Sequence, residues 1–453
     1  MMKIIVCGAG SVGSSIVSYL SRGSNDIIVI DTDSHKLDEI SKQWDIQPIK
    51  GSASHPDILE KAGARRADMI IAATNRDEVN LITCQVAHSL FNIPKKIARI
   101  DSASFLSPQW NILYNEKNIP VDLVISPEIE ISKAILKVLK IPGTSEVLSL
   151  ADKKVYLLAF RCPDNCPLIQ TPLMHLERLA PELDINIISI VRNGRSFISH
   201  GSDIIIPGDE IYFLVTTDKI SDTIRSFGME RTPNEKIIIF GGNRIARYIA
   251  TKLEENDNIQ SVKIIDENEE NARFLADKLK ETVVIHGEMM SDVILSEAGI
   301  QSTDAAIAVT AHDKDNLLAS LLAKKSGVSS AISLVNSRAY DNLIDNVYDN
   351  ILIDRSSVTI SSILQELRRA KLTDAYSLGR GFGELWEIRV DADSLIAGRT
   401  IADIGLPQNS IIGAICRDEN IIYPSSADKI EAGDLLIIFV NTQDIRKVER
   451  LLT

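Results

Sequence analysis

An internal repeat constrains the fold of this chain more than any other feature of its sequence. The segment KIIVCGAGSVG (residues 3–13) matches KIIIFGGNRIA (236–246), and AATNRDEVNLI (72–82) matches AVTAHDKDNLL (308–318). A second unit also repeats, because IIIPGDEIYFLV (204–215) matches KIEAGDLLIIFV (429–440) without a gap. The chain is therefore two tandem copies of a module that has two parts.

The two parts of the module differ in the pattern of their apolar residues. The first part alternates short runs of consecutive apolar residues, typical of strands buried on both faces, with stretches of helical periodicity. This alternation predicts a doubly wound parallel sheet. The second part is shorter and predicts a small α+β domain. The expected fold class is α/β, a tandem repeat of a Rossmann-like parallel sheet followed by a small α+β domain.

Stretches rich in breakers and polar residues indicate the domain boundaries. They lie near residues 141–143, 231–234 and 379–381. The predicted domains are 1–141 and 232–378, each a parallel sheet, and 142–231 and 379–453, each a small α+β domain.

Charge and composition exclude several classes of protein. The chain carries 49 Lys and Arg against 62 Asp and Glu, a formal net charge of −13, which gives no electrostatic reason to bind nucleic acid. No apolar run approaches the roughly 18 residues of a membrane span. The opening residues lead directly into a predicted strand, so we expect no signal peptide. The five scattered cysteines favour a reducing cytoplasm over a disulfide framework.

The first copy contains a complete G-x-G-x-x-G motif between a predicted strand and a predicted helix. Its residues are Gly8, Ala9, Gly10, Ser11, Val12 and Gly13. In this context the glycines permit a tight turn, the approach of a pyrophosphate and close packing of the helix. The free N–H groups at the helix start favour phosphate. Asp31 ends the next strand, where a carboxylate binds a ribose hydroxyl and repels a 2′-phosphate, so NAD or another plain adenine nucleotide is favoured over NADP.

Further candidate residues follow the other strands, because ligands of such sheets lie at the carboxyl ends of the strands. We expect Ser52 and Ala53 to line an adenine pocket, and Thr74 and Asn75 to contact the second ribose. Arg99 is a candidate phosphate ligand, with a surface ion pair as an equally supported alternative.

The second copy retains only part of this motif. Its candidate nucleotide contacts are Gly241, Gly242, Asn243, Arg244, Ile245 and Asp266. Asn243 replaces the glycine that approaches the pyrophosphate, and Leu334 stands where the first copy has Arg99. A weakened nucleotide site and a sheet retained only for its fold are equally supported.

No catalytic or metal-binding constellation accompanies these motifs. The seven histidines lack a partner at ligand spacing, and the Cys162–Cys166 pair has no second Cys or His pair. We therefore expect a protein that is not an enzyme. The alternatives are an NAD-dependent oxidoreductase, which lacks an evident proton donor here, and a dinucleotide sensor acting on a soluble partner.

The arrangement resembles the RCK (regulator of K⁺ conductance) family in its tandem form. The resemblance rests on GAGSVG with Asp31, on residues 55–80, on IARI (97–100) and on the Gly-Asp turns at 208–209 and 433–434. It covers essentially the whole chain.

The resemblance implies a function as well as a fold. It implies a regulatory subunit, cytoplasmic and peripheral on the inner face of the cell membrane, that binds a potassium-translocating membrane subunit of the Trk type. It also implies a ring that gates this partner, built as a homo-oligomer, most simply a homotetramer, with NAD(H), ATP or ADP as ligands. The nucleotide contacts named above are the positions that match the family's site, and in the second set Asn243 departs from the family's pattern.

Overall fold

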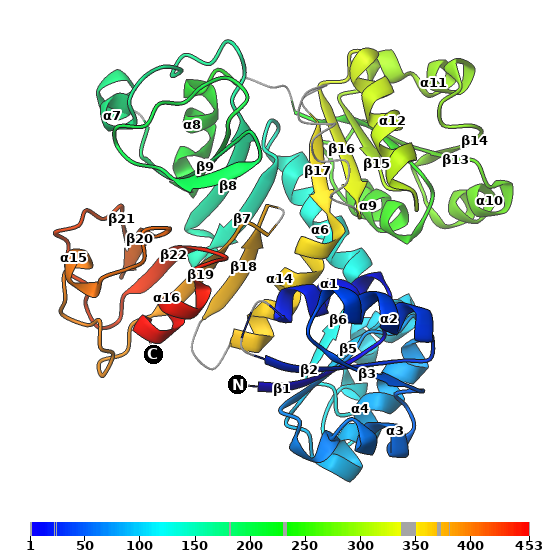
Figure 1. The fold of residues 1–453 in the computed structure, drawn as a ribbon. Helices are drawn as coiled ribbons and strands as arrows, with labels where there is room; N and C mark the ends of the chain where they lie inside the picture. Colours follow the sequence, from blue (N-terminus) through cyan, green and yellow to red (C-terminus); the bar gives the residue numbers. More distant parts are fainter. Residues whose placement is uncertain are drawn as a thin grey trace. The chain divides into compact units, whose positions relative to one another are not determined.

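The computed structural model describes residues 2–21, 23, 25–180, 183–229, 233–336, 350–368, 373–379 and 381–452. In these residues the strands form two parallel and two antiparallel sheets, which alternate along the chain (Figure 1). The chain is organised in two compact units, Met1–Glu130 with Val358–Glu366, and Ile131–Ser357 with Leu367–Thr453. The predicted fold class is confirmed.

The first parallel sheet has the strand order β3-β2-β1-β4-β5-β6. Its strands are β1 (Met2–Cys7), β2 (Asn25–Asp31), β3 (Gln47–Lys50), β4 (Met69–Ala72), β5 (Lys95–Arg99) and β6 (Leu123–Ile125). Its helices are α1 (Ser11–Leu20), α2 (Ser34–Gln43), α3 (Pro56–Lys61), α4 (Asp77–Phe91), α5 (Ala103–Leu106) and α6 (Pro127–Lys140).

The second parallel sheet repeats this order as β14-β13-β12-β15-β16-β17. Its strands are β12 (Lys236–Phe240), β13 (Ser261–Asp266), β14 (Val283–His286), β15 (Ala305–Ala308), β16 (Ser330–Val335) and β17 (Ile351–Asp354). Its helices are α9 (Arg244–Glu254), α10 (Glu269–Lys278), α11 (Asp292–Ala298), α12 (Asp313–Lys325) and α14 (Arg355–Arg368). In both parallel sheets the order reverses beside the first strand, which is where ligands of doubly wound sheets bind.

The antiparallel sheets have the orders β10-β9-β11-β8-β7 and β18-β19-β22-β20-β21. The first contains β7 (Glu146–Leu150), β8 (Val155–Arg161), β9 (Ile185–Arg192), β10 (Arg195–Ile198) and β11 (Glu210–Thr216), with α7 (Leu176–Leu179) and α8 (Ile220–Ser226). The second contains β18 (Asp374–Leu378), β19 (Gly383–Arg389), β20 (Ser410–Arg417), β21 (Asn420–Ile422) and β22 (Leu435–Asn441), with α15 (Ile401–Ile404) and α16 (Ile445–Leu452).

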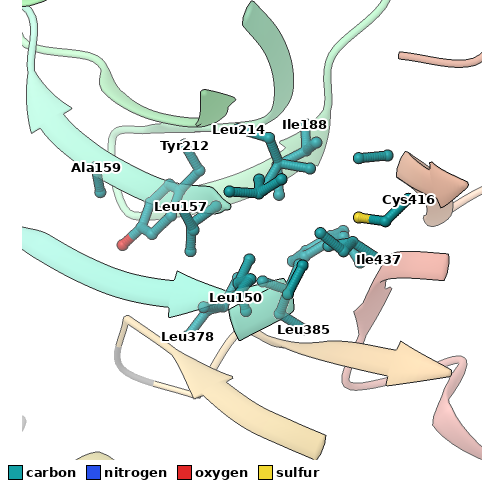
Figure 2. Close-up of a cluster of buried hydrophobic side chains, with 14 of the residues drawn as sticks. Leu150, Leu157, Ala159, Ile188, Tyr212, Leu214, Leu378, Leu385, Cys416 and Ile437 are labelled. Atoms are coloured by element: carbon teal, nitrogen blue, oxygen red, sulfur yellow. The ribbon is translucent and has the colours of Figure 1, made fainter. Parts of the chain in front are cut away.

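One hydrophobic core joins the two antiparallel sheets. Leu157 and Leu214 of the first sheet belong to the same buried cluster as Leu385 and Ile437 of the second (Figure 2). All four side chains are fully buried. Burying a Leu or Ile side chain contributes about 1.5–3 kcal/mol, so this shared core holds the two domains together as a pair.

Two backbone-to-carboxylate hydrogen bonds also cross this pair. The Ala151 N–H donates to Oε1 of Glu387 at 3.1 Å, and the Gly379 N–H donates to Oε2 of Glu146 at 2.9 Å. In each case the residue just after the first strand of one sheet contacts a glutamate of the other.

The predicted domain boundaries fall differently on the described structure. Residues 141–142 lie between α6 and β7, whereas residues 231–232 lie outside the described residues. The boundary at 378/379 falls at the end of β18, and β18 pairs with β19 of the sheet that follows. We propose that the fourth domain begins before Asp374.

Candidate functional site

The turn from β1 into α1 is tightly packed at Gly8 and Gly13 and has open space at Gly10. Gly8 has a φ of +106°, and a Cβ there would lie 2.8 Å from the Ala73 carbonyl oxygen. A Cβ on Gly13 would lie 1.8 Å from the Gly8 oxygen, so only glycine lets α1 pack this closely against the turn. A Cβ on Gly10 would meet nothing within 4 Å, which leaves space beside the helix start.

The start of α1 carries no side-chain cap. Gly10 is its N-cap residue and offers no hydrogen-bonding side chain. The first N–H groups of a helix lack intrahelical partners, and together with the helix dipole they favour an anion. An uncapped helix start beside open space can therefore hold a phosphate group.

The Asp31 carboxylate lies beside this turn. Its Oδ2 accepts the Ala9 N–H at 2.6 Å and its Oδ1 accepts the Asp33 N–H at 2.8 Å. These bonds fix the carboxylate at the end of β2, and a carboxylate retains further lone pairs for ribose hydroxyls. The Gly51 N–H donates to the Asp31 carbonyl oxygen at 2.9 Å, which brings the loop of Ser52 to the same edge.

A buried asparagine that the sequence prediction omitted ties the ends of β4 and β5 together. Asn80 is fully buried, and its Oδ1 accepts the Thr74 N–H and hydroxyl at 3.0 and 2.7 Å. Its Nδ2 donates to the carbonyl oxygens of Thr74 and Arg99 at 3.0 and 2.9 Å. Asn80 thus positions two of the predicted contacts. The sequence did contain a sign of this role, because the residues Thr74, Asp77 and Asn80 recur in the second copy as Thr310, Asp313 and Asn316.

The remaining predicted contacts differ in exposure and in their bonding partners. Asn75 is exposed, and the Ser52 hydroxyl is 2.9 Å from the hydroxyl of Ser54. Ala53 is 3% exposed and packs in the hydrophobic core. Arg99 forms a two-point ion pair with Asp101 at 3.0 and 2.6 Å. The structure thus shows Arg99 in an ion pair made by its Nε and Nη2 atoms, and this pair does not involve Nη1.

The second copy keeps the buried asparagine that joins two strand ends, and other residues occupy the predicted contact positions. Asn316 repeats the bonds of Asn80, because its Nδ2 donates to Thr310 and Leu334 carbonyl oxygens at 3.2 and 2.9 Å. Leu334 is fully buried. Of the predicted contacts, Gly242 donates its N–H to Asp266, while Asn243 caps α9 through the N–H of Ile245 at 2.9 Å. Gly241 has a φ of +91°, and Arg244 is exposed.

Among the described residues no group of three or more His, Cys, Asp or Glu side chains is placed to hold a metal ion. No helix in the described part of the chain has both the length and the apolar composition needed to cross a membrane.

Comparison with known proteins identifies the family. The TrkA-N domain model matches residues 4–127 and 237–354, and the TrkA-C domain model matches residues 157–228 and 385–453. A Trk system potassium uptake protein TrkA from Azorhizobium caulinodans is 37% identical over 450 residues, covering 99% of this chain and 98% of that protein. The chain belongs to the TrkA family. The TrkA of Vibrio alginolyticus is 36% identical with the same coverage.

Solved structures of RCK domains share the fold of this TrkA family member. The GsuK RCK domain matches with a TM-score of 0.62 at 17% identity, covering 99% of this chain and 94% of that one. The GsuK channel bound to NAD matches with a TM-score of 0.62 at 16% identity, covering 99% of this chain and 78% of that one. At this identity the match shows the fold alone.

Proposed function

We propose that this chain is the nucleotide-responsive regulatory subunit of a Trk-type potassium uptake system. The observation that carries the proposal is the first TrkA-N turn, where an uncapped α1, the open space at Gly10 and the Asp31 carboxylate meet at one sheet edge. Membership of the TrkA family supplies the connection to potassium uptake.

The residues at this turn fit an adenine nucleotide. The diphosphate would lie over Gly8, Ala9 and Gly10 at the start of α1, with the N–H groups of Ser11 and Val12 oriented by the helix. Asp31 would accept ribose hydroxyls. The other predicted contacts, Ser52, Ala53, Thr74, Asn75 and Arg99, would complete the pocket.

The ligand would be NAD(H), ATP or ADP, all of which carry a plain ribose and a diphosphate. Related RCK folds are described as bound to NAD and to ADP, which supports both ligand types. When bound, the nucleotide would supply charge and shape as a signal. We therefore propose a sensor and not an enzyme.

Regulation would work by a shift of populations. A ligand that binds one arrangement of the subunits more tightly than another moves the equilibrium toward the first. In the proposed system this chain acts at the cytoplasmic face of the membrane as a homotetramer, and its arrangement sets the activity of a potassium-translocating partner.

Calorimetric titration with ADP, ATP and NADH tests the site, and co-purification with a Trk-type membrane subunit tests the partner. Asp31→Ala should weaken nucleotide binding by about tenfold or more, because it removes hydrogen bonds from ribose hydroxyls to a charged acceptor. Glu39→Ala, an exposed acidic residue on α2, is the matched control and should bind as the wild type does. Equal affinity of Asp31→Ala and wild type, or no association with the membrane subunit, would refute the proposal.

A further inference from the structure

The helix starts of the two TrkA-N turns share their N-cap backbone conformation and carry different N-cap residues. The N-cap residue of α1, Gly10, has φ and ψ of −75° and −172°, and that of α9, Asn243, has −77° and −173°. Asparagine therefore occupies this position without a change of backbone. At the N-cap position itself, the difference between the two helix starts is therefore the side chain.

The Asn243 side chain occupies the start of α9. Its Oδ1 accepts the N–H groups of Ile245 and Ala246 at 2.9 and 3.1 Å. Its Nδ2 donates to the Val309 carbonyl oxygen, just beyond β15. The N–H groups that a phosphate would need are thus already bonded, and the carboxamide also ties the helix start to a neighbouring strand end.

In the second copy, the aspartate at the ribose position is bonded to a neighbouring side chain. Oδ2 of Asp266 accepts the Gly242 N–H and, at 3.2 Å, the Nδ2 of Asn271. The same Nδ2 donates to the Gly242 carbonyl oxygen at 2.8 Å. Asp266 is 9% exposed, and a Cβ on Gly242 would lie 2.6 Å from Leu275.

The first copy has a different residue at the position of Asn271. Lys36, on the exposed face of α2, stands at the position of Asn271 when Asp31 is aligned with Asp266. Asp31 itself is less buried than Asp266. The helix start is therefore uncapped in the first copy and capped in the second, and only in the second does a side-chain amide also bond the aspartate at the ribose position.

We infer that Asn243 determines which TrkA-N copy binds nucleotide, because its carboxamide takes the place of the diphosphate in the second copy. The inference rests on the proposed function, which assigns nucleotide binding to the first copy. The second copy then holds its turn in one conformation whatever the nucleotide level. Each chain reports the occupancy of a single site.

A reciprocal exchange of side chains tests this assignment. Gly10→Asn places the carboxamide at α1, where the space around Gly10 accepts it. Asn243→Gly with Asn271→Lys gives the second copy the residues that the first copy has at these two positions. Gly10→Ala is the matched control for the added Cβ, and it should impair binding less than Gly10→Asn does.

The readouts are the number of ADP or NADH molecules bound per full-length chain and the melting temperature without ligand. We expect one nucleotide per wild-type chain and two for the Asn243→Gly/Asn271→Lys variant. For Gly10→Asn we expect an affinity about a hundredfold lower, since two hydrogen bonds to charged oxygens are lost. Two nucleotides per wild-type chain, undiminished binding by Gly10→Asn, or no second nucleotide in the folded double variant would overturn the inference.

The ligand-free measurement separates this inference from the proposed function. Asn243→Gly should lower the melting temperature because a helix cap is lost, and Gly10→Asn should raise it because a cap is gained. If the wild type binds no nucleotide, the proposed function fails. The capping role of Asn243 still stands or falls on these two shifts, and unchanged melting temperatures in both variants would contradict it.

Discussion

The paired antiparallel sheets should lose stability as the pH rises through the neutral range. Glu387 is 4% exposed, and its burial raises its pKa to about 7, although the Ala151 N–H opposes the shift and Asp374 and Asp152 add to it. Burial likewise raises the pKa of Glu146 to about 8, with Glu210 adding to the shift. The Gly379 N–H and the Tyr212 hydroxyl lower the pKa of Glu146 in part.

The size of the effect follows from the two pKa values. A carboxyl with a raised folded-state pKa binds its proton more tightly in the folded protein, so its stabilising contribution is present at low pH and lost above that pKa. For Glu387, a change from about pH 6 to about pH 9 removes roughly 1.4 kcal/mol. Glu146 is partly exposed, and with a discount for solvent it adds roughly 1 kcal/mol.

The chain offers a local reporter for this measurement. Trp386 is fully buried next to Glu387 in β19, and the other tryptophans, Trp44 and Trp110, lie in the first parallel domain. In a background with Trp44→Phe and Trp110→Phe, Trp386 fluorescence follows urea unfolding of the paired sheets. The urea midpoint should fall steadily as the pH rises over this range.

Glu387→Gln tests the cause, because a glutamine keeps the hydrogen bond from Ala151 and cannot ionise. It should remove about half of the pH dependence and raise stability at alkaline pH. Exposed Glu39→Gln should leave the profile unchanged. A midpoint that rises with pH, or a Glu387→Gln profile that parallels its parent, would refute this reasoning.

Further predictions concern the buried asparagines and the glycine turn of the TrkA-N domains. Asn80→Ala should destabilise the first unit by about 3 kcal/mol in urea unfolding, because it leaves partly buried backbone groups of Thr74 and Arg99 unpaired. Asn316→Ala should act similarly on the second copy, and a loss below about 1 kcal/mol in both would show that these bonds are dispensable. Gly13→Ala should abolish nucleotide binding and lower the melting temperature, since its Cβ would lie 1.8 Å from the Gly8 oxygen. Normal binding by that variant would contradict the close packing of α1.

Features that repeat or follow a period could be predicted from the sequence. The alternation of apolar runs and helical stretches predicted the sheets, and the glycine motif with Asp31 predicted which sheet edge carries the candidate site. Glycine spacing is informative because it reflects local backbone needs, such as the φ of +106° at Gly8.

Features that depend on contacts across the fold could not be predicted. The sequence marked Asn243 as an obstacle, but its bonds to α9 and to Val309 depend on where two strands end. Asn80 was visible in the repeated pattern, and its role depends on the distance between β4 and β5. The pairing of Arg99 with Asp101 and the core position of Ala53 likewise depend on the three-dimensional fold.

Potassium flux into liposomes tests the central claim most directly. The wild-type chain, reconstituted with its Trk-type membrane subunit, should change the flux when ADP, ATP or NADH is added. The Gly10→Asn variant should assemble with the same subunit and lose this response. A flux that ignores nucleotides in the wild type, or that responds equally in Gly10→Asn, would contradict the account of this chain as a nucleotide-responsive regulator.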